Sequence, residues 1–256
     1  GSVQGLLDTL GVPYSGSGVL GSALCMDKAK TKLVWRSLGL PTPSFELIDR
    51  NSDLSAVIER LSSVFVKPVS EGSSVGMSIA NDADELQQAL ELAAKSQVAV
   101  MAEALISGEE FTVAIVNGKA LPPIKITPAT TFYDFDAKYV SGETLFECPA
   151  PITSAESAEL QALALSAFDA SGAEVWGRVD VMRGDDGWQL LEVNTIPGMT
   201  EHSLVPKAAA AAGISFVDLL AEIYQASLSR CSSKAGAKSD SDNAERTESV
   251  EGQYGA

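Results

Sequence analysis

Two short segments joined by a Gly-Asp-Asp-Gly turn hold the residue types best suited to chemistry. They read Gly-Arg-Val-Asp-Val-Met at 177–182 and Leu-Leu-Glu-Val-Asn at 190–194. Side chains two residues apart on a strand share a face, so Arg178 lies with Asp180, and Glu192 lies with Asn194. The turn predicts a hairpin, which makes Asp180 and Glu192 near neighbours.

These side chains form a candidate metal site. Two carboxylates on an otherwise apolar hairpin repel one another unless a cation lies between them. Mg²⁺ prefers oxygen ligands, and Asp180, Glu192 and Asn194 supply three of them. Arg178, on the same face, is suited to neutralising an acyl or phosphoryl oxyanion. The alternative interpretation is a solvent-facing sheet with scattered acidic residues.

A loop rich in glycine and hydroxyl groups is a candidate phosphate site. It follows Lys67 at the end of an expected strand and places Ser73 and Ser74 between two glycines. Glycine lets backbone N–H groups approach an anion closely, and hydroxyl groups add donors. The loop lacks the spacing of a Walker A motif, and a plain flexible turn is the alternative.

A helix start provides the third candidate. The chain leaves Asn194, turns at a Pro-Gly pair and begins a helix near Ser203. A helix N-terminus has free N–H groups and a positive dipole end, which suit a carboxylate. Ser203 as a plain N-cap is the alternative. The single histidine, His202, is interpreted as a surface or core residue.

Composition excludes several classes of function. The 256 residues carry a formal net charge of −16, which argues against nucleic acid as the main partner because a phosphate backbone would be repelled. One histidine argues against a hydrolase triad. No run approaches the roughly 18 apolar residues of a membrane-spanning helix. Cys25, Cys148 and Cys231 show no metal-ligand spacing, so we expect free thiols in a reducing cytoplasm.

Helix and strand patterns alternate irregularly along the chain. Periodicity predicts helices at 27–38, 53–62, 82–94, 154–172 and 203–229, the last broken near Gly213, and strands at 64–69, 98–103, 111–116, 175–183 and 188–194. A short helix is expected within 1–16, a long functional loop at 127–147 and a disordered tail at 231–256. Tight turns between adjacent strands favour an α+β fold with mainly antiparallel sheets.

Several blocks, in order, resemble the signature sequences of D-alanine–D-alanine ligases. They are Pro-Tyr-Ser-Gly-Ser at 13–17, Met-Asp-Lys at 26–28, Glu-Gly-Ser-Ser-Val-Gly at 71–76, Phe-Tyr-Asp-Phe at 132–135, Ala-Lys-Tyr at 137–139, Gly-Arg-Val-Asp-Val at 177–181, Glu-Val-Asn-Thr-Ile-Pro-Gly-Met-Thr at 192–200 and Ser-Leu-Val-Pro at 203–206. The resemblance covers about residues 2–225, and Asn-Thr-x-Pro-Gly-Met-Thr is its most diagnostic part.

The resemblance implies an ATP-grasp fold, in which two lobes clamp ATP. It also implies a cytoplasmic ligase that makes D-alanyl-D-alanine for peptidoglycan, and hence for the cell wall and cell shape. We expect a remnant of an N-terminal α/β domain at 1–16, a central lobe at 17–106, a C-terminal catalytic lobe at 107–230 and the tail at 231–256. The family carries a further N-terminal domain, largely through which it forms homodimers.

The resemblance assigns residues to the nucleotide and its metal ions. ATP contacts fall on Lys28, Lys67, Ser74, Glu103, Glu110 and Lys138, and two Mg²⁺ ions, with Mn²⁺ as a substitute, fall on Asp180, Glu192 and Asn194. The two lysines nearest the N-terminus meet the phosphates or adenine, the two glutamates meet adenine and ribose, and residues 70–76 close over the triphosphate. Ala104 stands where relatives often have lysine, which leaves the details of adenine recognition open.

The resemblance also implies the reaction. The γ-phosphoryl group passes to the carboxylate of the first D-alanine, and the amine of the second attacks the acyl phosphate. The residues implied are Arg178 and the Gly198 N–H for the oxyanion, Tyr139 and Ser73 for the attacking D-alanine, and Ser203 and Leu204 for the second carboxylate.

Two other functions stay open on the sequence alone. One is another ATP-grasp carboxylate–amine ligase, although residues 133–139 and 198–204 match the D-alanine enzymes beyond the grasp itself. The other is a nucleotide-binding fragment without ligase activity, because the family's N-terminal domain contributes an acidic residue toward the first D-alanine that nothing here replaces.

Overall fold

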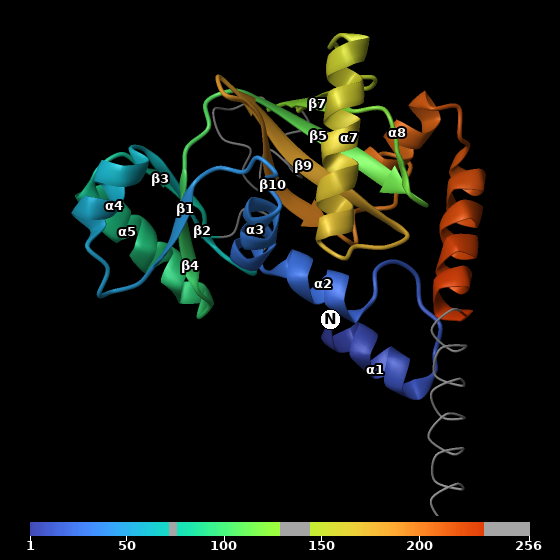
Figure 1. Cartoon of the computed structure of the whole chain (residues 1–256), viewed down its shortest axis with the longest axis horizontal. Helices are drawn as coiled ribbons and strands as arrows, with labels where there is room; N and C mark the ends of the chain where they lie inside the picture. Colours follow the sequence, from blue (N-terminus) through green and yellow to red (C-terminus); the bar gives the residue numbers. More distant parts are fainter. Residues whose placement is uncertain (72–75, 129–143, 233–256) are drawn as a thin grey trace, which may run out of the picture.

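The computed structural model describes residues 1–71, 76–128 and 144–232. Its strands form two antiparallel sheets, which helices cover and link (Figure 1). The helices are α1 (Ser2–Leu10), α2 (Val19–Met26), α3 (Lys28–Ser37), α4 (Leu54–Leu61), α5 (Ala83–Ala93), α7 (Ser154–Ala170), α8 (Leu204–Ala211) and the helix Phe216–Ser232. The strands are β1 (Phe45–Ile48), β2 (Val64–Pro68), β3 (Ser78–Ala80), β4 (Val100–Ala104), β5 (Glu109–Val116), β6 (Lys119–Ala120), β7 (Ile124–Thr127), β8 (Leu145–Glu147), β9 (Trp176–Gly184) and β10 (Gly187–Asn194).

The smaller sheet has the strand order β1–β4–β2–β3. Strand alternation turns Val64, Val66 and Ala102 to one face, where they are buried against α4 and α5. Figure 1 shows these two helices on the outer side of the sheet. The opposite face therefore carries the other set of side chains, including Lys67 and Glu103, toward the rest of the molecule.

The larger sheet has the order β10–β9–β5–β7–β8, with β6 paired to β5. On one face, Phe111, Val179 and Leu190 are fully buried and pack with Leu160 of α7 and Trp35 of α3. This apolar layer fixes the face to which every second residue of β5 and β9 points. The intervening residues are thereby directed to the other face, where the candidate site lies.

Helices cover one end of that other face. Ala114 and Trp176 pack there with Val205 of α8 and Leu219 of the last helix, while the same face continues to Asp180. Among the described residues, no single helix is long and apolar enough to cross a membrane. The last two helices meet the length and composition requirement only together, and the chain bends by 108° between them.

Helix α3 lies between the two sheets (Figure 1). Ala29 packs with Phe45 and with a methionine of β4 in the smaller sheet, whereas Trp35 joins the core of the larger sheet. The side chains of Lys28 and Lys32, one helical turn apart, are buried at this junction. The helix thus delivers two cations to the region between the sheets.

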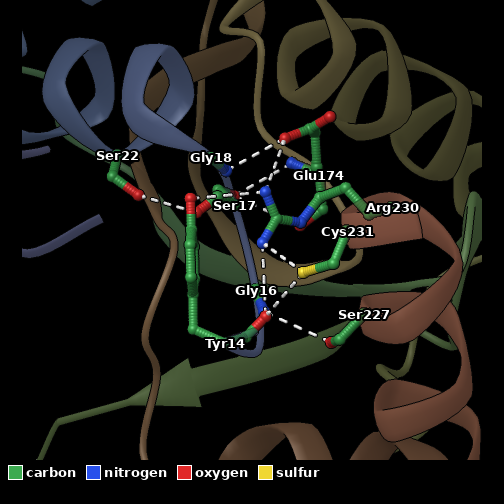
Figure 2. Close-up of polar contacts among 9 residues, drawn as sticks. All are labelled: Tyr14, Gly16, Ser17, Gly18, Ser22, Glu174, Ser227, Arg230 and Cys231. Atoms are coloured by element: carbon green, nitrogen blue, oxygen red, sulfur yellow. Dashed lines mark hydrogen bonds and ion pairs between the residues drawn. The ribbon is translucent and has the colours of Figure 1, made fainter. Parts of the chain in front are cut away.

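The last helix is tied to the N-terminal segment by a polar cluster, shown in Figure 2. The Arg230 guanidinium lies 4.3 Å from the centre of the Tyr14 ring, donates to the Tyr14 carbonyl oxygen at 3.2 Å and lies 3.9 Å from a carboxylate oxygen of Glu174. That same oxygen of Glu174 accepts the N–H of Gly18 at 2.9 Å. Arg230 therefore joins three segments that are far apart in sequence.

We expect Arg230→Met to lower the free energy of unfolding by about 2 kcal/mol, because part-buried acceptors lose a buried, charged donor. Chemical denaturation monitored by circular dichroism measures the loss. Lys119→Met is the matched control: its side chain is 76% exposed and lies 4.0 Å from Glu222. A surface pair contributes less than about 0.5 kcal/mol. Equal losses in the two variants would show that the cluster adds no stability.

The α+β fold with mainly antiparallel sheets is confirmed, and the predicted helices and strands form within a few residues, the helical region 203–229 as two helices separated near Gly213. Two expectations need correction: residues 145–147 pair with β7 instead of belonging to a long loop, and the last helix continues to Ser232 instead of ending at 229. The separate helix at 19–26 was not predicted. Short elements such as β1 and β3 were missed because three or four residues carry too little periodicity. Residues 233–256 of the expected tail lie outside the described residues, and the lobe boundaries stay a prediction.

Candidate functional site between the two sheets

The predicted pairing of Asp180 with Glu192 is present, but an irregularity in the hairpin creates it. From the turn, Leu190 pairs with Val181, and then the register shifts so that Glu192 pairs with Asp180. Leu191 is the extra residue, as in a β-bulge. Without the shift, Glu192 would fall on the apolar face beneath α7. The bulge therefore puts both carboxylates on the same face of the sheet, opposite α7.

Asp180 is buried and held by two neighbours. The Arg178 guanidinium donates to both of its carboxylate oxygens, at 2.8 Å each, and the Thr112 hydroxyl donates to Oδ1 at 2.6 Å. Thr112 lies directly opposite Asp180 on the neighbouring strand β5. A two-point contact with arginine fixes the plane of the carboxylate as well as its position.

Glu192 lies beside a cation from the other side of the site. Lys28 Nζ is 3.0 Å from Glu192 Oε2 and also donates to the carbonyl oxygen of Glu71 at 2.8 Å. Glu71 is the residue before the glycine–serine loop. Lys28 thus links the start of the predicted phosphate loop to the strand of the predicted metal site.

The residues present suit a hard divalent cation. Asp180 and Glu192 are cross-strand neighbours, and Asn194, two residues further along, faces the same way. Arg178 and Lys28 lie beside the two carboxylates and neutralise their charge. Within the described residues, no group of three His, Cys, Asp or Glu side chains is placed to hold a metal ion. A metal would therefore need the asparagine amide, water or ligand oxygens to complete its shell.

A second cluster of charges lies on the inner face of the smaller sheet. Glu103, only 3% exposed, has one carboxylate oxygen 2.5 Å from Lys67 Nζ and the other 2.5 Å from Lys32 Nζ. Burial by itself raises the pKa of Glu103, but the charges of Lys32 and Lys67 outweigh it and hold the pKa below 4.5. Burial also lowers the pKa of Lys32 to about 8.

The Glu103 pKa has a consequence for acid stability. A carboxyl whose pKa is lower when folded contributes stability above its unfolded pKa, and this is lost as the pH falls through the folded pKa. We therefore expect the free energy of unfolding to fall more steeply below about pH 4.5 in the wild-type protein than in Glu103→Gln. Denaturant titrations at a series of acidic pH values measure both slopes. Parallel slopes would contradict the expectation.

The start of α8 is open rather than capped. The Ser203 side chain accepts no N–H from the helix, and its oxygen instead accepts the N–H of Thr200 at 3.0 Å. An N-cap oxygen normally binds the N–H of the second or third helical residue, and the third here is Pro206, which has none. A side-chain carbon on Gly198 would lie 2.9 Å from the Ser203 hydroxyl. The helix start and the Gly198 backbone therefore lie together, and Ser203 occupies the N-cap position without making a side-chain cap hydrogen bond.

Other predicted site residues divide into two groups. Glu110 pairs with Met182, two positions from the Thr112–Asp180 pair, so it lies on the same face as Asp180. Four predicted residues lie outside the described residues: Ser73, Ser74, Lys138 and Tyr139. Sequence reasoning missed Lys32, Thr42 and Thr112. The only available signal was the placement of Lys32 one turn after Lys28, on the same helical face.

Comparison with known proteins gives one consistent result. The family described as D-ala D-ala ligase C-terminus matches residues 34–225. A D-alanine–D-alanine ligase of Saccharophagus degradans is 51% identical over 230 residues, which are 89% of this chain and 73% of that protein. The crystal structure of a D-alanine–D-alanine ligase from Bacillus anthracis is 39% identical, with a TM-score of 0.82 over 91% of this chain and 77% of that one. The same enzyme complexed with ATP is 38% identical, with a TM-score of 0.80 over 91% and 76%.

Proposed function

Because the chain belongs to the D-alanine–D-alanine ligase family, we propose that the site between its two sheets joins two D-alanine molecules in an ATP-dependent reaction. The fold is the ATP-grasp fold, and the product, D-alanyl-D-alanine, serves peptidoglycan synthesis. The observation that carries the assignment of the site is the pairing of Asp180 with Glu192 across the bulged hairpin, with Arg178 and Lys28 beside them. Acidic ligands next to cations are what a metal–triphosphate complex requires.

The nucleotide lies between the sheets in this proposal. Lys28 and Lys67 extend toward the region from different elements and supply positive charge for phosphate oxygens. The Glu103 carboxylate, held between two lysines, contacts the nucleoside, and Glu110 contacts the ribose. The Ser74 and Lys138 assignments rest on the resemblance alone. Support comes from the positions of both lysines, which are buried between the elements of the site and lie beside the carboxylates of Glu192 and Glu103.

Asp180, Glu192 and Asn194 would hold Mg²⁺, or Mn²⁺ in its place. When bound, the metal neutralises charge on the transferring phosphoryl group. Thr112 and Arg178 fix the Asp180 carboxylate, and Lys28 fixes Glu192, so these two ligands are positioned before a nucleotide arrives. Such pre-organisation lowers the cost of reorganising the site during the reaction.

Arg178 and the helix start would act on the D-alanines. The first D-alanine carboxylate accepts the γ-phosphoryl group, and the second amine attacks the resulting acyl phosphate, which releases phosphate. The Arg178 guanidinium and the Gly198 N–H stabilise the oxyanion. The open N–H groups of α8, with Ser203 and Leu204, bind the carboxylate of the second D-alanine. Ser73 and Tyr139 orient its amine, as the resemblance implies.

The function is tested by phosphate release from Mg-ATP, with and without D-alanine, on this chain as given. We expect release that depends on D-alanine and a dipeptide product detected by mass spectrometry. If ATP with Mg²⁺ raises the melting temperature but D-alanine elicits no release, the chain is a nucleotide-binding fragment. If another amino acid replaces D-alanine as the better acceptor, the ligase has a different substrate.

We further propose a cytoplasmic location and the homodimeric assembly of the family.

A further inference from the structure

Lys32 is a buried cation to which the proposed reaction assigns no role. Its side chain is 0% exposed, so its ammonium group cannot contact ATP, a metal ion or D-alanine directly. Removing a lysine from water is costly, and here burial lowers its pKa to about 8. The contacts of Lys32 must therefore compensate for the free energy that its burial costs.

The Lys32 ammonium has three partners from three separate parts of the chain. They are Glu103 Oε1 at 2.5 Å, Thr42 Oγ1 at 2.7 Å and the carbonyl oxygen of Leu190 at 2.9 Å. The contacts with Thr42 and Leu190 are hydrogen bonds, and the contact with Glu103 is an ion pair. Glu103 belongs to the smaller sheet and Leu190 to the larger one. A single nitrogen therefore connects the two lobes.

The contact with Glu103 fixes the carboxylate assigned to the nucleoside. One of its oxygens binds Lys32 and the other binds Lys67, so the plane of the carboxylate has no freedom to rotate. Without Lys32, one oxygen of a carboxylate that is 3% exposed loses its nearest cation. The ionised form of that carboxylate is then less stable, which favours its protonation or its rotation.

The contact with Leu190 fixes the bulge. Leu190 is the last regularly paired residue before the register shift. Its carbonyl oxygen accepts from Lys32 and also from the Thr42 hydroxyl at 2.8 Å, and its N–H donates to the Pro41 carbonyl oxygen at 2.9 Å. β10 is the edge strand of the larger sheet, and these hydrogen bonds take the place of those that a further strand would make with Leu190. They hold the segment whose bulge directs Glu192 to the Asp180 face.

We propose that Lys32 is a positioning residue that couples the nucleoside-side carboxylate of Glu103 to the metal-side strand of Glu192. Nucleotide affinity and its dependence on Mg²⁺ both rely on Lys32, although its ammonium touches neither ligand. The inference rests on the proposed function of the site. A purely structural role would instead lower the stability of the protein and leave the difference between the ATP affinities with and without Mg²⁺ unchanged.

The test is isothermal titration calorimetry of ATP binding, with Mg²⁺ and with EDTA, on three single variants of the full chain. Lys32→Met keeps the apolar stem and removes the ammonium. Thr42→Val removes one of the two donors to the Leu190 carbonyl and leaves Glu103 with both lysines. Lys30→Met is the matched control, because its side chain lies on the same helix but is 71% exposed and pairs with Asp27. Circular dichroism verifies folding of each variant.

We expect Lys32→Met to weaken Mg-ATP binding at least about 10-fold and to weaken binding in EDTA as well, because both contacts are lost. Thr42→Val should reduce the gain in affinity from Mg²⁺ by about 3-fold while changing binding in EDTA by less than about 2-fold. Lys30→Met should match the wild type in both conditions.

The outcomes separate the two proposals. If the wild type binds Mg-ATP and a folded Lys32→Met binds it within about 2-fold as well, the positioning role is overturned and the proposed function stands. If Lys32→Met does not fold, Thr42→Val decides: an unchanged Mg²⁺ gain overturns the inference, and a reduced gain supports it. A wild type that binds no nucleotide overturns both.

Discussion

Replacing Glu192 with glutamine is expected to lower D-alanine-dependent phosphate release by about 1,000-fold, equivalent to about 4 kcal/mol in the barrier. Glutamine has nearly the same shape but no charge, so it is a poorer ligand for a divalent cation. It also leaves Lys28, which lies 3.0 Å away, without its carboxylate partner. Both effects weaken the same part of the site, where charge must be neutralised during phosphoryl transfer.

The measurement is a coupled assay of phosphate release at saturating Mg-ATP, supported by a melting curve for each protein. Asp186→Asn is the matched control, since it makes the same change of charge on the exposed turn of the same hairpin. It should retain the wild-type rate. A Glu192→Gln rate within tenfold of the wild type would exclude Glu192 as a metal ligand for the reaction.

Arg178→Met is expected to lower kcat by about 100- to 1,000-fold, the usual effect of removing one group that stabilises an oxyanion. The KM for ATP should change less, because Asp180 loses its two-point contact but keeps its hydrogen bond from Thr112. A loss in kcat alone marks an interaction made in the transition state. Arg178→Lys, which keeps the charge but not the two-point contact with Asp180, should recover part of the rate.

Steady-state kinetics with varied ATP and varied D-alanine separate these quantities. Arg183→Met serves as the control on the same strand: Arg183 pairs with Glu156 and lies over the Trp188 ring, away from Asp180. It should leave kcat unchanged and lower stability slightly. If Arg178→Met raises the KM for ATP and spares kcat, Arg178 binds the nucleotide rather than the oxyanion.

The sequence by itself determined the parts of this protein that depend on near neighbours in the chain. The predicted helix at 82–94 is present, and Asp82 caps its start by accepting the N–H of Glu85. The Gly-Asp-Asp-Gly turn predicted the hairpin of β9 and β10. Alternation on β9 put Arg178 beside Asp180, and they are bonded. Each of these signals comes from residues within one turn or one strand, where local geometry leaves few alternatives.

The tertiary structure alone decided which face of the larger sheet the Glu192 carboxylate occupies. Strict alternation from the turn would place Glu192 in the apolar layer beneath α7, and a bulge at Leu191 reverses this. Contacts from Pro41, Thr42 and Lys32 to Leu190 hold that edge, and Lys32 is 158 positions away. No local pattern encodes such a contact, because it exists only once α3 is packed between both sheets and removed from water.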